Sequence, residues 1–190
     1  MRAGATAPLI GLQIEYSLLE RTVEGDLIPM AQELGLGVTP WSPLRGGALT
    51  GKYTRQTAGT DKPGRAWMID RAFKGNDQAY AVVDVLIAIA KEVEATPAAV
   101  ALAWVAGRPG VTSTIIGART PEQLEANLAA TKVQLSPEQR ARLDEVSKPT
   151  LPFPHGFLST IGGGMYGGMK VNGDSPPPSP FAPKPGQRTW

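Results

Sequence analysis

The sequence predicts an α/β fold in which parallel strands alternate with helices, followed by a long C-terminal tail. Three short segments rich in β-forming residues are separated by segments whose apolar residues recur at helical spacing, and this alternation is typical of parallel βαβ units. From Pro149 onward, 9 prolines and 8 glycines fall within 42 residues without periodicity. We therefore expect a packed region at 1–148 and a poorly ordered tail at 149–190.

The first strand is expected within 9–19 and the second at 37–44, with a helix at 24–34 between them. The apolar residues of this helix recur at helical spacing: Leu27, Ile28, Ala31 and Leu34. Gly35 is a natural residue to end it. Pro40 and Pro43 lack an N–H, so the ladder of hydrogen bonds is expected to end or bulge in the second strand.

A long Gly-rich and basic connection is expected at 45–76. An amphipathic helix follows at 77–94, and Thr96-Pro97 begins another that runs to about Ala106. Residues 111–117, which read VTSTIIG, are dense in β-branched residues and predict a third strand. Thr120 and Ser136 each precede a Gln three positions later, the pattern of a capping box, and are expected to begin helices ending near Ala130 and Val146.

Composition excludes several kinds of site. Without cysteine there is no disulfide, no thiolate metal site and no cysteine nucleophile, and a single histidine excludes a His-rich metal site. The formal net charge of +2 comes entirely from the tail, because residues 1–149 hold 16 basic and 16 acidic residues. We therefore expect no nucleic-acid partner.

No apolar run reaches the ~18 residues of a membrane span. Pro8 and Gln13 interrupt the apolar part of the N-terminus, so no signal peptide is expected and the protein is predicted to be cytoplasmic, without a membrane partner. Between Arg45 and Lys74 the sequence has seven basic residues and only two acidic ones, Asp61 and Asp70, which gives this basic segment a charge of +5. A solvated loop is one interpretation of it and an anion site is another.

Three strands are too few for an independent parallel sheet, whose faces and edges must be covered. The chain therefore resembles one end of a larger structure. With the first strand starting within a dozen residues of Met1, we expect either a truncated chain or a second polypeptide that supplies the missing strands.

Three motifs occur in series: QIEYSLL at 13–19, GVTPWSPLRGG at 37–47 followed by LTGKY at 49–53, and IIGARTPEQLEAN at 115–127. Together they resemble the C-terminal half of the aldo/keto reductase family, over about residues 9–148. The family is a (β/α)8 TIM barrel that reduces carbonyl compounds with NADPH. The resemblance implies a partial barrel of three βα units, corresponding to its sixth, seventh and eighth strands, and a barrel of this kind typically needs about 250 residues.

The resemblance implies that Gln13 contacts the nicotinamide carboxamide and that the nicotinamide ring stacks on Trp41. An amide side chain supplies both a donor and an acceptor, and an indole supplies a flat apolar face. The alternatives are a polar residue inside the barrel for Gln13 and ordinary core packing for Trp41.

The resemblance further places a run of small residues along the cofactor's pyrophosphate, and we expect the basic segment to assist them. This run comprises Ser42, Pro43, Leu44, Gly46 and Gly47.

Residues after the third strand are implied to bind the adenosine end of the cofactor: Gly117, Arg119, Gln123 and Asn127. A guanidinium next to a helix N-terminus suits a 2′-phosphate and favours NADP(H) over NAD(H). A surface arginine is the alternative for Arg119. Ala126 stands where the family often has an acidic residue, so one hydrogen bond to adenine is expected to be missing.

The family's acid–base residues, an Asp, a Tyr, a Lys and a His on its first four strands, have no counterpart here. His155 lies in the tail, and no tyrosine occupies a matching motif. We therefore expect no catalytic residue in this chain and no carbonyl reduction by the chain alone, with open sheet edges that promote association. The second hypothesis is a non-catalytic module that binds NADP(H) or a partner, and the third is a small α/β domain without a cofactor.

Overall fold

The computed structural model describes residues 8–57, 66–165, 169–170 and 173. The chain divides into two compact units, Met1–Pro149 and Thr150–Trp190, and each is described by itself. Lys62 and Arg65 of the basic segment lie outside the described residues, as does the proline run at 176–178.

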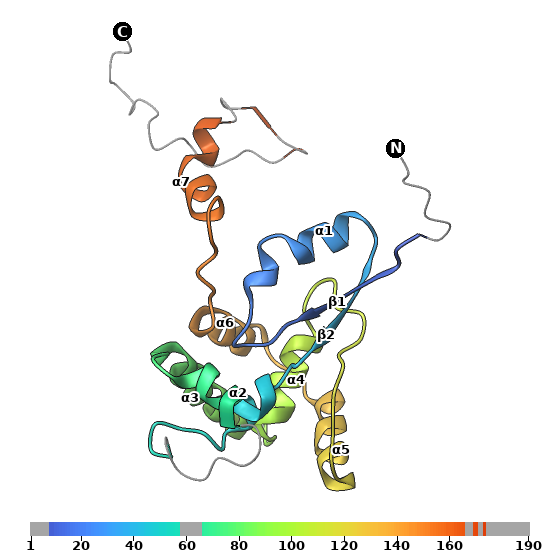
Figure 1. Ribbon diagram of the computed structural model, residues 1–190, viewed down its shortest axis with the longest axis vertical. Helices are drawn as coiled ribbons and strands as arrows, with labels where there is room; N and C mark the ends of the chain where they lie inside the picture. Colours follow the sequence, from blue (N-terminus) through green and yellow to red (C-terminus); the bar gives the residue numbers. More distant parts are fainter. Residues whose placement is uncertain (1–7, 58–65, 166–168, 171–172, 174–190) are drawn as a thin grey trace. The chain divides into compact units, whose positions relative to one another are not determined.

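A two-stranded parallel sheet forms the centre of the first unit (Figure 1). Strand β1 (Gly11–Glu15) pairs with β2 (Gly37–Trp41) in a register that places Gln13 opposite Thr39 and Glu15 opposite Trp41. The first two expected strands are therefore confirmed. Helix α1 (Leu27–Glu33), preceded by the 3-10 turn η1 (Thr22–Glu24), connects them and buries Ile28 and Ala31. Gly35, with a φ of 65°, ends this connection as expected.

The third strand was predicted wrongly. Residues 111–117 run beside β2 but form only one β-bridge, Val38 to Val111. Their N–H groups donate to β2 carbonyls at Val38 (Thr112 N, 2.8 Å) and Pro40 (Ile115 N, 2.8 Å). The backbone of alternate β2 residues faces this segment, and at Pro40 that backbone has no N–H to donate in return. The ladder consequently ends after one bridge, and the segment continues extended but irregular.

Helices follow β2 in the expected order. The 3-10 segment η2 (Arg45–Thr50) and helix α2 (Ala66–Phe73) lie where only a connection was expected. The expected helices are α3 (Asp77–Glu92), α4 (Pro97–Ala106), α5 (Pro121–Leu128), which is extended by η3 (Ala129–Lys132), and α6 (Pro137–Val146).

The predicted caps are present. The Thr96, Thr120 and Ser136 side chains each accept a bond from the backbone N–H three residues later, and the Ser136 box is reciprocal.

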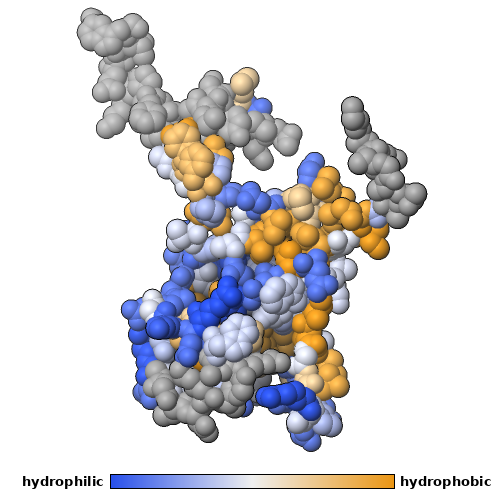
Figure 2. Space-filling model, in the orientation of Figure 1, coloured by the Kyte–Doolittle hydropathy of each residue, from blue (hydrophilic) through white to orange (hydrophobic). Residues whose placement is uncertain are grey.

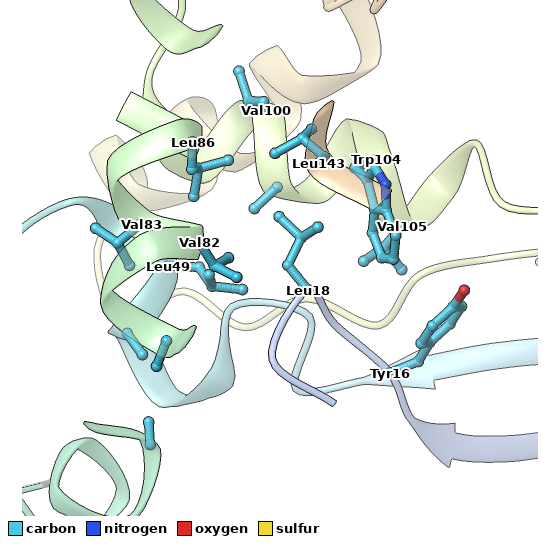
Figure 3. Packing of buried hydrophobic residues seen from close by; sticks show 14 of the residues in the cluster. Tyr16, Leu18, Leu49, Val82, Val83, Leu86, Val100, Trp104, Val105 and Leu143 are labelled. Atoms are coloured by element: carbon cyan, nitrogen blue, oxygen red, sulfur yellow. The ribbon is translucent and has the colours of Figure 1, made fainter. Parts of the chain in front are cut away.

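The core of this unit lies between α3, α4 and α6 and the chain that follows each strand (Figure 3). Leu86 of α3, Trp104 of α4 and Leu143 of α6 are fully buried, and Leu18 reaches them from the chain after β1. α4 is buried on most sides, because its residues Val100, Ala101, Trp104 and Val105 belong to one cluster and Ala99 and Leu102 to another.

The second unit contains helix α7 (His155–Met165), which the sequence analysis did not expect. Phe153 and Phe157 contact each other at its start, with ring centroids 5.9 Å apart. Phe157, Leu158, Ile161 and Met165 recur at helical spacing, but the three glycines at 162–164 disfavour a helix and hid it from prediction. In the described part of the chain, no helix is both long and apolar enough to cross a membrane.

Candidate functional site

The two faces of the β1–β2 ribbon differ in what covers them. Residues opposite each other in a parallel pair point to the same face, and successive residues alternate. Ile14, Val38 and Pro40 are buried toward the helices, whereas Gln13 and Trp41 are exposed. The register places four side chains on this open face: Gln13, Glu15, Thr39 and Trp41.

The register thus brings Gln13 and Trp41 to one surface. Gln13 pairs with Thr39, two residues before Trp41, so the amide and the indole are diagonal neighbours near the carboxyl ends of the strands. Trp41 is 40% exposed, which leaves a large part of its ring open to a ligand. The core-packing alternative for Trp41 does not fit this exposure.

The loop after β2 has an unusual backbone. Ser42 and Arg45 have φ values of 55° and 49°, and Gly46 and Gly47 have 66° and 106°, so four of six residues are left-handed. Pro43 is buried and Leu44 is half-buried, so these two side chains fix one side of the loop against the rest of the unit. A Cβ on Gly46 would meet Met68 of α2 at 3.0 Å, whereas a Cβ on Gly47 would meet nothing within 4 Å. The loop is therefore packed on one side and open at Gly47, which allows a ligand to approach the backbone there.

Arg45 links this loop to β1. Its guanidinium forms an ion pair with the Glu15 carboxylate and lies 3.8 Å from a Glu20 carboxylate oxygen. The Arg45 side chain is only 13% exposed. The pair joins the carboxyl ends of the two strands at the edge of the open face.

The residues expected at the adenosine end form a small network of their own. Asn127 is buried and donates from Nδ2 to the Gly117 carbonyl at 3.3 Å. Gln123 accepts from the Arg119 N–H at 2.9 Å. Arg119 is exposed, and a Cβ on Gly117 would meet nothing within 4 Å. The two amides thus shape the turn before α5, and the Arg119 side chain is exposed to solvent.

The basic segment is only partly available as an anion site. Arg55 forms an exposed ion pair with Asp77 at 2.8 Å, and its guanidinium lies 5.1 Å from the Tyr80 ring centroid. Arg45 is paired as described above. Part of the +5 charge is therefore matched by acidic residues that lie outside the segment.

Tyr16 directly follows Glu15, the register partner of Trp41, and belongs to a buried ionic network and not to the open face. Its hydroxyl donates to Glu24 at 2.5 Å and accepts from Arg108 at 3.0 Å. Burial and the adjacent Glu24 carboxylate raise the pKa of Tyr16 well above its ordinary value. Tyr16 is therefore a poor proton donor at neutral pH.

The same network stabilises the packing of η1 against α4 and α6. Arg21 pairs with Glu24 at 2.8 Å and donates to the Asp144 carbonyl, while Arg108 binds the Asp144 carboxylate at 2.9 and 3.0 Å. Both guanidinium groups lie within 5.1 Å of the Trp104 ring centroid. Burial works to raise the pKa of Glu24, but the bonds from Arg21 and Tyr16 outweigh it and hold that pKa below its ordinary value.

The structure adds residues that the sequence analysis missed. Glu15 follows Gln13 by two positions, so the alternation of side chains along a strand would have predicted it on the same face. Thr114 Oγ1 is buried and has no hydrogen-bond partner among the described residues. Within the described ranges, no group of three or more His, Asp or Glu side chains could hold a metal ion.

Comparison with known proteins agrees with the motifs. The model of the aldo/keto reductase family matches residues 1–148. An uncharacterized oxidoreductase of Bacillus subtilis, YrpG, is 42% identical over 138 residues, which cover 73% of this chain and 40% of the relative. A probable aldo-keto reductase 1 of Glycine max is 32% identical over 168 residues, 88% of this chain and 46% of the relative.

A third relative is a putative voltage-gated potassium channel subunit beta of Schizosaccharomyces pombe. It is 37% identical over 145 residues, which cover 70% of this chain and 41% of the relative. The chain thus spans less than half the length of these curated relatives.

Proposed function

The chain belongs to the aldo/keto reductase family, and from that premise we propose that it carries the NADP(H)-binding half of a carbonyl reductase. The family's barrel is a (β/α)8 fold, and the mixed α/β arrangement with its two-stranded parallel sheet is consistent with part of one. The bound cofactor would supply a hydride to an aldehyde or ketone. The residues described above would bind and orient it.

The observation that carries the proposal is the register that places Gln13 and Trp41 on one open face. The exposed Trp41 ring offers a flat apolar surface to the nicotinamide, and the Gln13 amide offers a donor and an acceptor to its carboxamide. An open aromatic ring beside an amide is unfavourable for an isolated sheet face, since it leaves apolar surface in water, and a stacked ligand removes that cost.

The two loops support the phosphate groups. The left-handed loop from Ser42 to Gly47 leaves space above Gly47 for the pyrophosphate. Arg119, exposed at the start of α5, would bind the 2′-phosphate, and the space at Gly117 lets the adenosine approach. The fit is chemical: backbone N–H groups and an exposed guanidinium are the donors that a phosphate-bearing cofactor needs, and small residues let it approach the backbone.

The proton donor must come from outside the described site. We propose that it belongs to the remainder of the barrel, which would add to β1. In the described part of the chain, the β1 backbone groups that point away from β2, at Gly11, Gln13 and Glu15, have no backbone partner. Exposed apolar side chains also occur just before β1 and on α1: Leu9, Ile10, Leu27, Met30 and Leu34. Figure 2 shows the hydrophobic surface over β1 and α1.

A titration of the wild-type chain with NADPH, followed by isothermal calorimetry, tests the proposal. We expect saturable binding, tighter for NADPH than for NADH, and no NADPH consumption with an aldehyde substrate. Adding the part of the Bacillus subtilis relative that this chain does not match should yield a complex in size-exclusion chromatography and restore turnover. Absence of NADPH binding would refute a preformed cofactor half.

The second candidate is a non-catalytic module that binds NADP(H) or a protein partner, favoured by the similarity to the putative channel subunit. It predicts NADPH binding without turnover even in the complemented complex, so the same experiment separates the two candidates. For either candidate we propose a cytoplasmic location, which fractionation of cells expressing the tagged chain would test.

A further inference from the structure

The ion pair between Arg45 and Glu15 joins the pyrophosphate loop to the open face, and neither residue has been assigned a role so far. Glu15 is in register with Trp41 and shares the open face with Gln13. Arg45 reaches back from the loop to this carboxylate, with Glu20 3.8 Å away as a second acidic neighbour. An acidic residue therefore stands beside the ring on which we expect the cofactor to stack.

The position of Arg45 is more specific than that of the other basic residues. Its backbone lies in the left-handed loop, between Ser42, whose carbonyl accepts the Arg45 N–H at 2.8 Å, and the open Gly47. Arg55, eight residues beyond Gly47 in the sequence, is exposed and paired with Asp77 of α3. Among the described basic residues of the segment, Arg45 is thus the one at the point where a bound pyrophosphate would leave the Trp41 ring.

Arg45 also has a backbone conformation that its neighbours must maintain. A non-glycine residue with φ of 49° is disfavoured and persists only where the surrounding contacts hold it. Those contacts are the bond to Ser42 and the ion pair with Glu15. Breaking the ion pair would free both the guanidinium and the loop.

Resting on the proposed cofactor site, we propose that Glu15 lowers affinity for the anionic cofactor by holding Arg45. A pyrophosphate is a stronger partner for a guanidinium than one carboxylate, since it carries more negative charge and has more acceptor oxygens. On binding, the Arg45 guanidinium exchanges Glu15 for the pyrophosphate. Glu15 is therefore an affinity-determining residue that acts through Arg45, and Arg45 is an anion-binding residue of the site.

Calorimetric titration of full-length variants with NADPH tests this arrangement. Glu15→Gln should bind about threefold more tightly, the effect of losing one partly exposed ion pair. Arg45→Gln should bind about tenfold more weakly, the effect of losing a charged hydrogen bond. The double variant should match Arg45→Gln, because Glu15 acts only through Arg45. Glu92→Gln and Arg142→Gln are matched controls, since they remove the same charges from the exposed pair between α3 and α6.

The outcomes are separable. If the wild type binds NADPH and Glu15→Gln binds it with the same or lower affinity, the inference is overturned and the proposed function stands. A gain of affinity by Glu15→Gln in the Arg45→Gln background would also overturn it, because simple repulsion would then explain the effect. If the wild type does not bind, binding by Glu15→Gln alone would support the inference, and absence of binding in both would refute the site and the inference together. Urea midpoints of all variants show whether each is folded.

Discussion

Replacing Trp41 by alanine should weaken NADPH binding far more than it weakens the fold. Trp41 is 40% exposed, and a tryptophan has roughly 250 Å² of surface, so about 100 Å² of the ring is open. A stacked ring covers about half of this, worth about 1 kcal/mol at ~25 cal/mol per Å², and stacking geometry adds about 1 kcal/mol. The expected loss is about 2 kcal/mol, or ~30-fold in Kd.

The assay is calorimetric titration with NADPH for wild type, Trp41→Ala and Trp41→Phe. The phenylalanine variant keeps an aromatic face and should stay within about fivefold of wild type. Met30→Ala on α1 is the control, because Met30 is also 40% exposed but lies away from the open face. If Trp41→Ala binds within threefold of wild type while its urea midpoint is unchanged, the stacking role of Trp41 is wrong.

Three further predictions concern the fold. Leu143→Ala should destabilise the first unit by about 2–5 kcal/mol in urea titration, because this side chain is fully buried, whereas Leu128→Ala, half exposed on α5, should change stability by no more than about 0.5 kcal/mol; equal effects would contradict the assigned core. Glu24 has a lowered folded-state pKa, so its stabilisation is present above its unfolded value of 4.5 and is lost as pH falls below it. Glu24→Gln should therefore be less stable at neutral pH and lose less stability between about pH 5 and pH 3, and an unchanged pH slope would refute this. Ile10→Lys should reduce self-association in sedimentation velocity, because Ile10 is 82% exposed beside the open edge of β1; a wild type that stays monomeric at high concentration would contradict the exposed edge.

Local signals in the sequence predicted much of the secondary structure. Caps at Thr96, Thr120 and Ser136 began helices at the expected places because a side-chain acceptor and a proline at the first helical position act within one turn. The helices α2 and α7 were missed for the opposite reason. Both have apolar residues at helical spacing, but each is short and lies among glycines, whose low helix propensity favoured a loop.

The third strand shows why a local signal is insufficient for a sheet. Residues 111–117 have the composition of a strand, but a strand also needs a partner that returns its hydrogen bonds. Pro40 faces this segment from β2 and has no N–H to offer. The proline was visible in the sequence, yet which neighbour it would face depends on the register of β1 and β2.

The sequence by itself determined the family, the order of the elements, and that Gln13, Trp41 and the loop after it are candidate cofactor residues. It did so because motifs and caps are local, and they survive in a chain that spans less than half of its relatives. Only the tertiary structure decided that Gln13 and Trp41 share one open face, and that Arg45 is held by Glu15 across two strands. Those facts depend on the strand register and on an ion pair between Arg45 and a residue 30 positions away, and no local pattern specifies either.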